Sequence, residues 1–89
     1  MENLDSLREK MDKINLEILS LLNKRMEIAL QIKEIKEKKQ LPMHDPEREN
    51  KMLIQLLEKN PGPLPSEDVS HLFKAIFECS LKNMSAFFS

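Results

Sequence analysis

Apolar residues recur along the first half of the chain at alternating steps of three and four, which is the spacing of one face of an α-helix. The stripe starts at Leu4, and no Gly or Pro interrupts the chain before Pro42. The pattern therefore predicts one long helix over residues 4–39, with Asn3 or Asp5 as its N-cap.

Two shorter helices are predicted to follow, each opened by a capping signal. Asp45 is followed by a proline, which suits the first helical position, so a helix is expected over residues 46–59. The segment 60–65 contains three prolines and the single glycine and cannot be helical. Ser66 then predicts a third capped start, with a helix over residues 67–87.

The length of the first helix determines the expected architecture. About 36 residues at 1.5 Å each give a helix of about 54 Å, whereas a compact chain of 89 residues has a diameter near 30 Å. Two shorter helices cannot cover the whole apolar stripe of the first. We therefore expect one domain over residues 1–89, with an all-α fold of three helices that forms a two-fold homodimer.

The composition agrees with a helical fold and excludes several classes of function. The chain has one Gly, no Trp and no Tyr, and its 14 basic and 15 acidic residues give a net charge of −1. Such a balance provides no net field to attract nucleic acid or a membrane. The single cysteine, Cys79, is expected to be a buried helical thiol in a reducing compartment. No signal sequence or membrane-length apolar run is found, so a cytoplasmic location is expected.

Two basic residues of the first helix are candidates for binding an anion. Arg25 stands where the stripe needs an apolar residue, between Leu21 and Ile28. Either its stem packs while its head reaches solvent or an acidic partner, or the side chain enters a central cavity and holds an anion. Lys36 follows after nearly three whole turns, so both side chains project on one side about 16 Å apart. Alone, Lys36 is weak evidence, because the charged run 33–39 is typical of a solvated surface.

Polar residues also interrupt the apolar faces of the two shorter helices. Arg48 and Glu49 lie on a face that should be buried, where an internal salt bridge or a wet first turn explains them as well as a binding site does. Ser80 interrupts the stripe of the third helix, and back-bonding to the helix would explain it without a ligand. His44 and His71 are too isolated for a metal site or a catalytic triad, so no metal is expected.

Taken in order, these segments resemble the all-helical chorismate mutase family. The resemblance extends over essentially the whole chain and rests on Leu7–Lys10, Lys24–Arg25, Lys36, Asp45–Glu49 and Ser80. The segments 60–63 and 72–77 further resemble the subgroup fused to 3-deoxy-7-phosphoheptulonate synthase, the first enzyme of the shikimate pathway. The resemblance implies an intertwined homodimer with two shared active sites, which rearranges chorismate to prephenate in aromatic amino-acid biosynthesis without a metal or cofactor.

The resemblance also implies roles for the basic residues and the serine. Arg25 and Arg8 of the partner subunit would bind the two carboxylates of the dianionic substrate. Lys36 would address the ether oxygen and a carboxylate, and Ser80 a carboxylate. These are the charge-assisted contacts that hold a flexible substrate in a reactive geometry.

The remaining predicted site residues include one departure from the family. Arg48 would support the anion-binding network, and Asp45 and Glu49 would bind the ring hydroxyl. Where the family commonly presents Gln or Glu to the ether oxygen, this chain has Met84. Losing one such donor can reduce the rate roughly a hundredfold. Either the activity is low, or Asn83 replaces the donor through a shifted third helix.

Two alternative functions remain open from the sequence. An isochorismate pyruvate lyase would share the fold and the cationic pocket and differ in its substrate. A regulatory domain of low activity, which senses the ligand while another enzyme acts, is favoured by Met84. The resemblance to a fused subgroup also points to a shikimate-pathway enzyme as a fused or associated partner.

Overall fold

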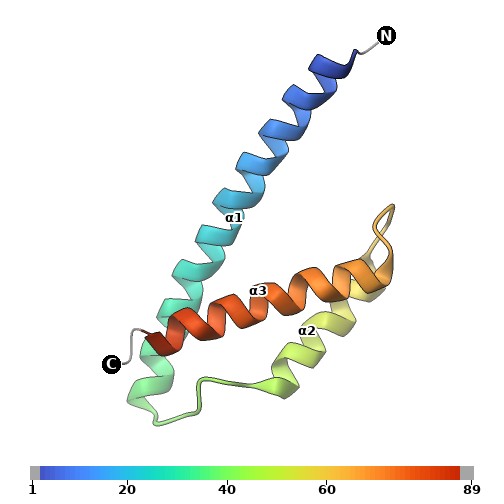
Figure 1. Cartoon of the computed structure of the whole chain (residues 1–89). Helices are drawn as coiled ribbons and strands as arrows, with labels where there is room; N and C mark the ends of the chain where they lie inside the picture. Colours follow the sequence, from blue (N-terminus) through green and yellow to red (C-terminus); the bar gives the residue numbers. More distant parts are fainter. Residues whose placement is uncertain (1–2, 87–89) are drawn as a thin grey trace.

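The computed structural model describes residues 3–86, which form three helices (Figure 1). They are α1 (Leu4–Lys38), α2 (Pro46–Lys59) and α3 (Ser66–Ala86). Residues 3–86 contain no strand, and none of their helices is long and apolar enough to cross a membrane. The predicted all-α fold of one long and two shorter helices is confirmed. The predicted end near Phe87 lies outside the described residues.

Side chains cap the first two helices. The Asn3 Oδ1 atom accepts a hydrogen bond from the amide of Ser6 at 2.8 Å, so Asn3 and not Asp5 caps α1. The Asp45 Oδ1 atom accepts from the amide of Arg48 at 3.1 Å and caps α2, as the sequence predicts. Each cap satisfies one of the amides that a helix start leaves without an intrahelical partner.

The third helix begins one residue earlier than predicted. The amides of Asp68 and Val69 both donate to the carbonyl of Pro65, at 3.1 Å each. Ser66 is therefore the first residue of the helix rather than its cap. The backbone carbonyl of Pro65 accepts the first hydrogen bonds of α3. Ser66 therefore predicted the position of the helix start correctly, but its side chain is not the cap.

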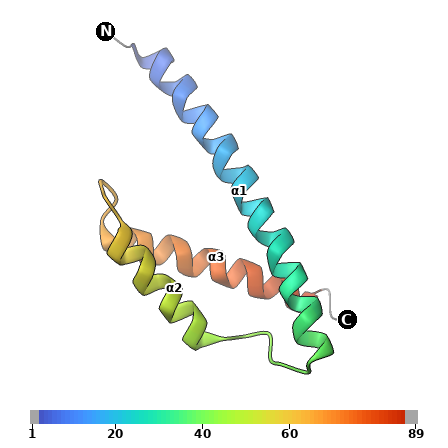
Figure 2. The same ribbon diagram turned by 180° about the vertical axis from the view of Figure 1, so that it is seen from behind.

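The three helices are arranged around α3. This helix packs against both α1 and α2, which do not contact each other. Figures 1 and 2 show the N-terminal half of α1 standing away from the other two helices. The molecule measures 57 × 26 × 15 Å and has a radius of gyration of 16.4 Å, whereas a compact chain of this length would have about 12 Å.

The buried core is small for this reason. Among the described residues it consists of Ala29, Val69, Phe77 and Met84, together with the side chain of Lys33. The apolar stripe along the N-terminal half of α1 stays 49–63% exposed; it comprises Leu4, Leu7, Met11, Ile14, Ile18 and Leu21. A single copy of the chain therefore leaves most of this stripe in water.

Two residues differ in burial from what the sequence suggested. Cys79 is exposed, so the prediction of a buried thiol is wrong. It lies two residues after buried Phe77, about 200° around the helix, and so faces the other way. Lys33 is only 7% exposed although it belongs to a charged run, because it lies one turn after buried Ala29; its Nζ atom is 3.4 Å from a Glu37 carboxylate oxygen.

One asparagine closes the turn between α2 and α3. The Asn60 Nδ2 atom donates to the carbonyl of Leu64 at 2.8 Å, and its Oδ1 atom accepts from the amide of Gly62 at 3.0 Å. Gly62 has a φ of 78°, a conformation that favours glycine. The two ends of one amide side chain thus connect three positions of the turn.

We expect Asn60→Ala to lower the free energy of unfolding by about 1 kcal/mol, since both hydrogen bonds are lost. Asn60→Asp is the matched control, because it keeps an acceptor for Gly62 and loses only the donor to Leu64. It should cost about half as much. Urea unfolding followed by circular dichroism measures both values. Equal losses would contradict a structural contribution of the bond to Gly62.

Candidate functional site

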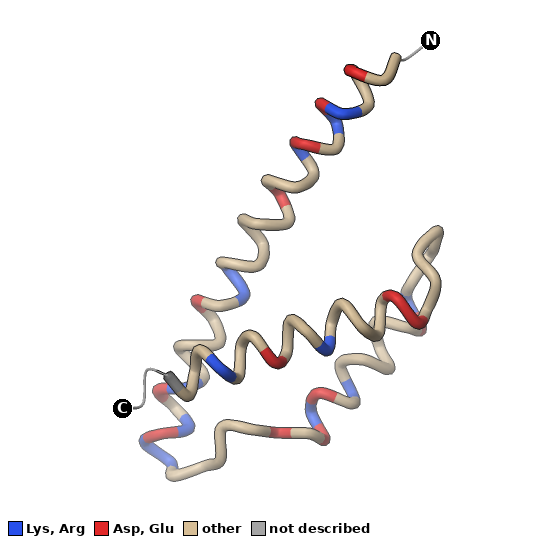
Figure 3. Tube along the Cα trace, viewed as in Figure 1, with Lys and Arg blue, Asp and Glu red and all other residues tan. Residues whose placement is uncertain are grey.

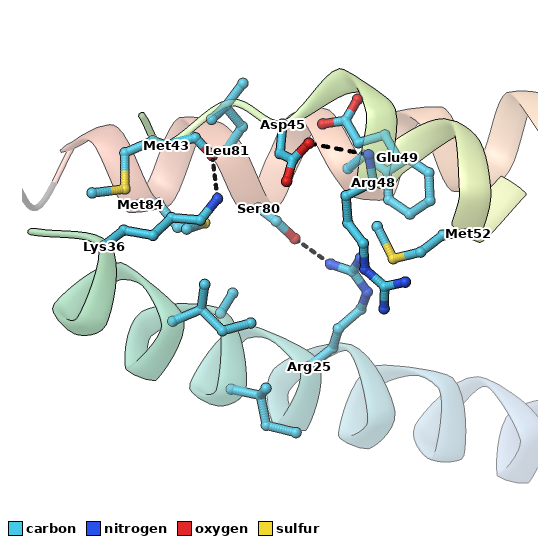
Figure 4. A pocket seen from close by; sticks show the side chains of 14 residues that line it. Arg25, Lys36, Met43, Asp45, Arg48, Glu49, Met52, Ser80, Leu81 and Met84 are labelled. Carbon is cyan, nitrogen blue, oxygen red and sulfur yellow. Dashed lines mark hydrogen bonds between the residues drawn. The ribbon is translucent and has the colours of Figure 1, made fainter. Parts of the chain in front are cut away.

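A pocket of about 490 Å³ lies between α1, the start of α2 and α3 (Figure 4). The first helix lines it with Arg25, Ile28, Ala29, Ile32 and Lys36. The segment before α2 and the first two turns of that helix contribute Met43, Asp45, Arg48, Glu49 and Met52. The third helix contributes Phe77, Ser80, Leu81 and Met84. The volume suits a small organic ligand.

Seven of the eight predicted site residues line this pocket; they are Arg25, Lys36, Asp45, Arg48, Glu49, Ser80 and Met84. The eighth, Arg8, is exposed on the projecting half of α1. It precedes Arg25 by 17 residues, which is about 25 Å along a helix axis. The pocket of one chain is therefore formed without Arg8.

Arg25 is held in the pocket by two residues of α3. Its Nη1 atom donates to the Oγ atom of Ser80 at 2.5 Å, and its guanidinium carbon lies 5.3 Å from the centre of the Phe77 ring. The Ser80 hydroxyl lies toward Arg25 across the pocket (Figure 4). Of the two interpretations of Arg25, the structure supports the one in which the side chain enters a cavity.

Lys36 lies at the other end of the pocket. Its Nζ atom donates to the backbone carbonyl of Met43 at 3.1 Å, and its side chain is partly buried. A carbonyl is a neutral acceptor, so this contact fixes the ammonium group without neutralising it. Arg25 and Lys36 thus reach one pocket from the same face of α1, as their spacing predicts.

Arg48 brings a third positive charge. Its side chain and that of Arg25 point toward one another across the pocket (Figure 4). Within residues 3–86, neither guanidinium group has a carboxylate within salt-bridge distance. Basic and acidic positions are otherwise interspersed along all three helices (Figure 3). The excess of positive charge is therefore local to the pocket, and such a cluster favours an anionic ligand.

Neither of the two carboxylates of the pocket forms a salt bridge with these cations. Asp45 caps α2 through its Oδ1 atom. The Glu49 Oε2 atom lies 3.6 Å from the Nε2 atom of His44, an exposed loop residue. Among residues 3–86, no salt bridge joins Arg48 and Glu49. Arg48 is exposed and Glu49 half-buried, so the wet first turn that the sequence allowed is compatible with the structure.

Met84 lies at the same end of the pocket as Lys36 (Figure 4) and is only 7% exposed. Asn83 lies outside the lining, and its Nδ2 atom donates back to the carbonyl of Cys79 at 2.8 Å. The register of α3 therefore places the methionine, and not the asparagine, at the position where the resemblance expects a donor.

Sequence reasoning missed Phe77 as a site residue. Of the polar and apolar residues of the third helix, the sequence singled out Ser80 and Met84, yet Phe77 is at 6% exposure and more deeply buried than Phe73. The signal was present in the spacing, since Phe77 lies four residues after Phe73 and three before Ser80 and so shares their face. Apolar residues at helical spacing indicate a core, and here the core is also the wall of the pocket.

The described residues contain no cluster of three or more His, Cys, Asp or Glu side chains placed to hold a metal ion. His71 is exposed on α3. What the pocket offers is a set of cationic hydrogen-bond donors beside apolar walls. Such an arrangement can bind a small organic anion and fix its conformation.

Comparison with known proteins assigns the family. Residues 7–84 match the model of the family described as chorismate mutase type II. The chain belongs to this chorismate mutase family. Two solved structures of chorismate mutase from Thermus thermophilus, form II and form I, share the fold. Form II has a TM-score of 0.92 at 40% identity, covering 94% of this chain and 96% of that one. Form I has a TM-score of 0.87 at 42% identity, covering 89% and 99%.

Curated relatives of this chorismate mutase domain are longer proteins. The bifunctional chorismate mutase/prephenate dehydratase of Aquifex aeolicus is 41% identical over 85 residues, which is 91% of this chain and 24% of the relative. That of Neisseria gonorrhoeae is 41% identical over 73 residues, 81% of this chain and 20% of the relative. The chain thus spans about a quarter of such relatives or less. Their second activity is not the synthase of the expected subgroup, so that likeness is not confirmed.

Because Arg25 and Arg48 carry like charges that face each other in the pocket, we expect their repulsion to lower the stability of the fold. At low ionic strength, Arg48→Gln should raise the free energy of unfolding by about 0.5 kcal/mol, because it relieves repulsion with Arg25. The gain should shrink as salt is added. Lys51→Gln, on α2 outside the pocket lining, is the control and should change little. Urea unfolding at two salt concentrations measures both; equal effects of the two substitutions would contradict a charged pocket.

Proposed function

We propose that this chain catalyses the rearrangement of chorismate to prephenate, a step of aromatic amino-acid biosynthesis. The observation that carries the proposal is the group of three cationic side chains, Arg25, Lys36 and Arg48, which face one pocket without a carboxylate partner. Chorismate is a dicarboxylate of a size that such a pocket can hold. Membership of the chorismate mutase family supports the same reaction.

The rearrangement needs position and charge rather than a reactive side chain. One carbon–oxygen bond breaks while one carbon–carbon bond forms in the same cyclic transition state, and no proton changes place. The substrate must therefore be held with its side chain over its ring, in a chair-like geometry. Charged donors fixed at both ends of a pocket can enforce that geometry and supply part of the barrier reduction.

Within this site, Lys36 is proposed to act on the ether oxygen. An ammonium group has three donors, and one of them is directed to the Met43 carbonyl, which leaves two for a substrate. Negative charge grows on the ether oxygen as its bond breaks, so a fixed ammonium stabilises the transition state more than the bound substrate.

The other residues are proposed to bind the ground-state groups of the substrate. Arg25, held by Ser80, would bind one carboxylate, and Arg48 would strengthen the same anion network. Asp45 and Glu49, at the start of α2, would accept hydrogen bonds from the ring hydroxyl. These assignments follow the family resemblance and are supported by the position of all five side chains on the pocket wall.

The second carboxylate is proposed to be bound by Arg8 of the partner subunit, in an intertwined homodimer. Two features support this assembly. The apolar stripe of the N-terminal half of α1 is about half exposed or more in one chain, and a second copy of the stripe is a matching cover. A two-fold pairing of the long helices would also bring Arg8 of one copy toward Arg25 of the other.

The names of the bifunctional relatives pair chorismate mutase with a prephenate dehydratase, an activity named for the product of the proposed reaction. They support a fused or associated enzyme of the same pathway as a partner of this chain. A cytoplasmic location is proposed on the same ground.

The test of the function is an assay of the pure protein with chorismate and, separately, with isochorismate. Loss of chorismate with formation of prephenate supports the proposal. Turnover of isochorismate alone would identify a pyruvate lyase instead. Binding of prephenate with negligible turnover of either substrate would identify a ligand-sensing domain, a result that the apolar Met84 in the pocket makes worth measuring.

Removing a pocket cation should abolish most of the activity. We expect Arg25→Ala and Lys36→Ala each to reduce turnover of chorismate at least about a hundredfold, since each loses a charge-assisted contact in the transition state. Helix content by circular dichroism should stay unchanged. Lys74→Ala, at an exposed position of α3 outside the pocket, is the control. Near-normal turnover in either pocket variant would refute the assignment of that residue.

Restoring a donor at residue 84 should increase the rate. Met84→Gln is expected to raise kcat, up to about a hundredfold, because its amide can donate to the ether oxygen. Met84→Leu, which fills a similar volume without a donor, should leave kcat near that of the unaltered chain. Thermal unfolding of both variants shows whether the buried amide destabilises the fold. An equal kcat in the two variants would contradict a missing donor at this position.

Shared active sites predict complementation between two inactive variants. In a heterodimer of an Arg8→Ala and an Arg25→Ala subunit, one site carries both lesions and the other is intact. Each homodimer has two damaged sites. Random exchange of subunits should therefore restore activity at up to about a quarter of all sites, because half of the dimers are mixed and half of their sites are whole.

Mass spectrometry under native conditions provides the control by showing that mixed dimers have formed. If they have formed and the mixture is no more active than its parents, Arg8 does not act across subunits. Sedimentation at micromolar concentration tests the assembly itself, and a folded monomer there would refute the dimer.

A further inference from the structure

The ring of Phe77 makes a cation–π contact with Arg25, and the proposed reaction does not itself require this contact. The guanidinium carbon of Arg25 lies over the ring, 5.3 Å from its centre. The ring is fixed: Phe77 is 6% exposed, and its centre lies 6.3 Å from that of Phe73 at an angle of 53°. Tilted aromatic pairs at this separation attract each other. The arginine therefore rests on a surface that cannot easily move.

The kind of partner matters for an anion site. A carboxylate at residue 77 would also fix the guanidinium, but it would neutralise the charge and compete with an incoming anion. The face of an aromatic ring attracts a cation through its quadrupole and leaves the net charge unchanged. Ser80, one turn later on α3, accepts a hydrogen bond from Nη1 and is also neutral. Of the five N–H donors of Arg25, the contact with Ser80 is directed to one end only.

A fixing contact is needed here because Arg48 points toward Arg25 from the opposite wall (Figure 4). Two guanidinium groups that face each other without a carboxylate between them repel, and repulsion favours rotamers that carry Arg25 away from the pocket. An attraction of the cation–π type, strongest when the ring is shielded from water, opposes that movement. Phe77 is such a ring.

We infer that Phe77 is a positioning residue, which holds the Arg25 guanidinium in the pocket through a cation–π contact while keeping its charge available for an anion. The inference rests on the proposed function for the identity of that anion, chorismate. The contact between ring and guanidinium can be tested without it.

The experiment replaces Phe77 by phenylalanine analogues with one, two and three fluorine atoms on the ring. Fluorine weakens the negative potential of the ring face while the shape changes little, so packing is nearly preserved. Two quantities are measured across the series: kcat/KM for chorismate, and the rate at which the Arg25 Nε proton exchanges with water, by NMR without ligand. The same series at Phe73, which packs against Phe77, is the matched control.

We expect both quantities to change stepwise with fluorine number at residue 77, reaching about a fivefold loss of kcat/KM and a comparable acceleration of exchange with three fluorines. The series at residue 73 should stay flat. A purely structural ring would give flat series at both residues, which would overturn the inference. Parallel changes at both residues would overturn it too, since they would reflect fluorination in general.

A fall in kcat/KM at residue 77 without faster exchange of the Arg25 proton would also refute positioning, because the ring would then act on the substrate directly. The exchange measurement separates this inference from the proposed function. An unaltered protein that does not convert chorismate would refute the function, while the stepwise change in exchange would still establish the contact.

Discussion

The site depends on neutral partners that hold two of its three positive charges, those of Arg25 and Lys36, in one pocket. The Ser80 hydroxyl and the Phe77 ring hold Arg25, and the Met43 carbonyl holds Lys36. Each partner fixes a side chain and leaves its charge intact. Had the same side chains been fixed by carboxylates, the pocket would be satisfied within itself and would gain little from an anion. The helices can be understood as the frame that brings these neutral partners, mostly on α3, opposite the cations of α1.

The same frame explains the unusual shape of the chain. Because α3 packs against both other helices of residues 3–86, the pocket forms where α1 and α3 cross, at the C-terminal part of α1. Within residues 3–86, neither α2 nor α3 then reaches the N-terminal half of α1. Arg8 lies on that half, about 25 Å from Arg25 along the helix. The packing that creates the pocket therefore also places Arg8, a candidate substrate-binding residue, too far away to reach the pocket of its own chain.

The sequence predicted those features that depend on local physics. Helical spacing and capping residues gave all three helices, and the interruption of the α1 stripe by Arg25 identified a pocket residue. Features that depend on the path of a loop, or on which face of a helix is buried, were harder to predict from the sequence. The partner of Lys36 is a backbone carbonyl, which no residue type signals. Phe77 was not singled out, and Cys79 was predicted buried although it faces the opposite side of α3. An apolar residue on a helix does not reveal whether it borders protein or a cavity.

Three of the four buried apolar residues among residues 3–86, Ala29, Phe77 and Met84, also form the wall of the pocket. In a larger protein, a chemist can alter an active site while a separate interior keeps the fold together. Here the two tasks share the same side chains. Any replacement of these residues that improves the fit to a ligand also changes the interior of the protein. Ligand binding therefore cannot be improved here without affecting the stability of the fold. This overlap makes Met84 costly to exchange for a polar residue, whatever that residue might add to the chemistry.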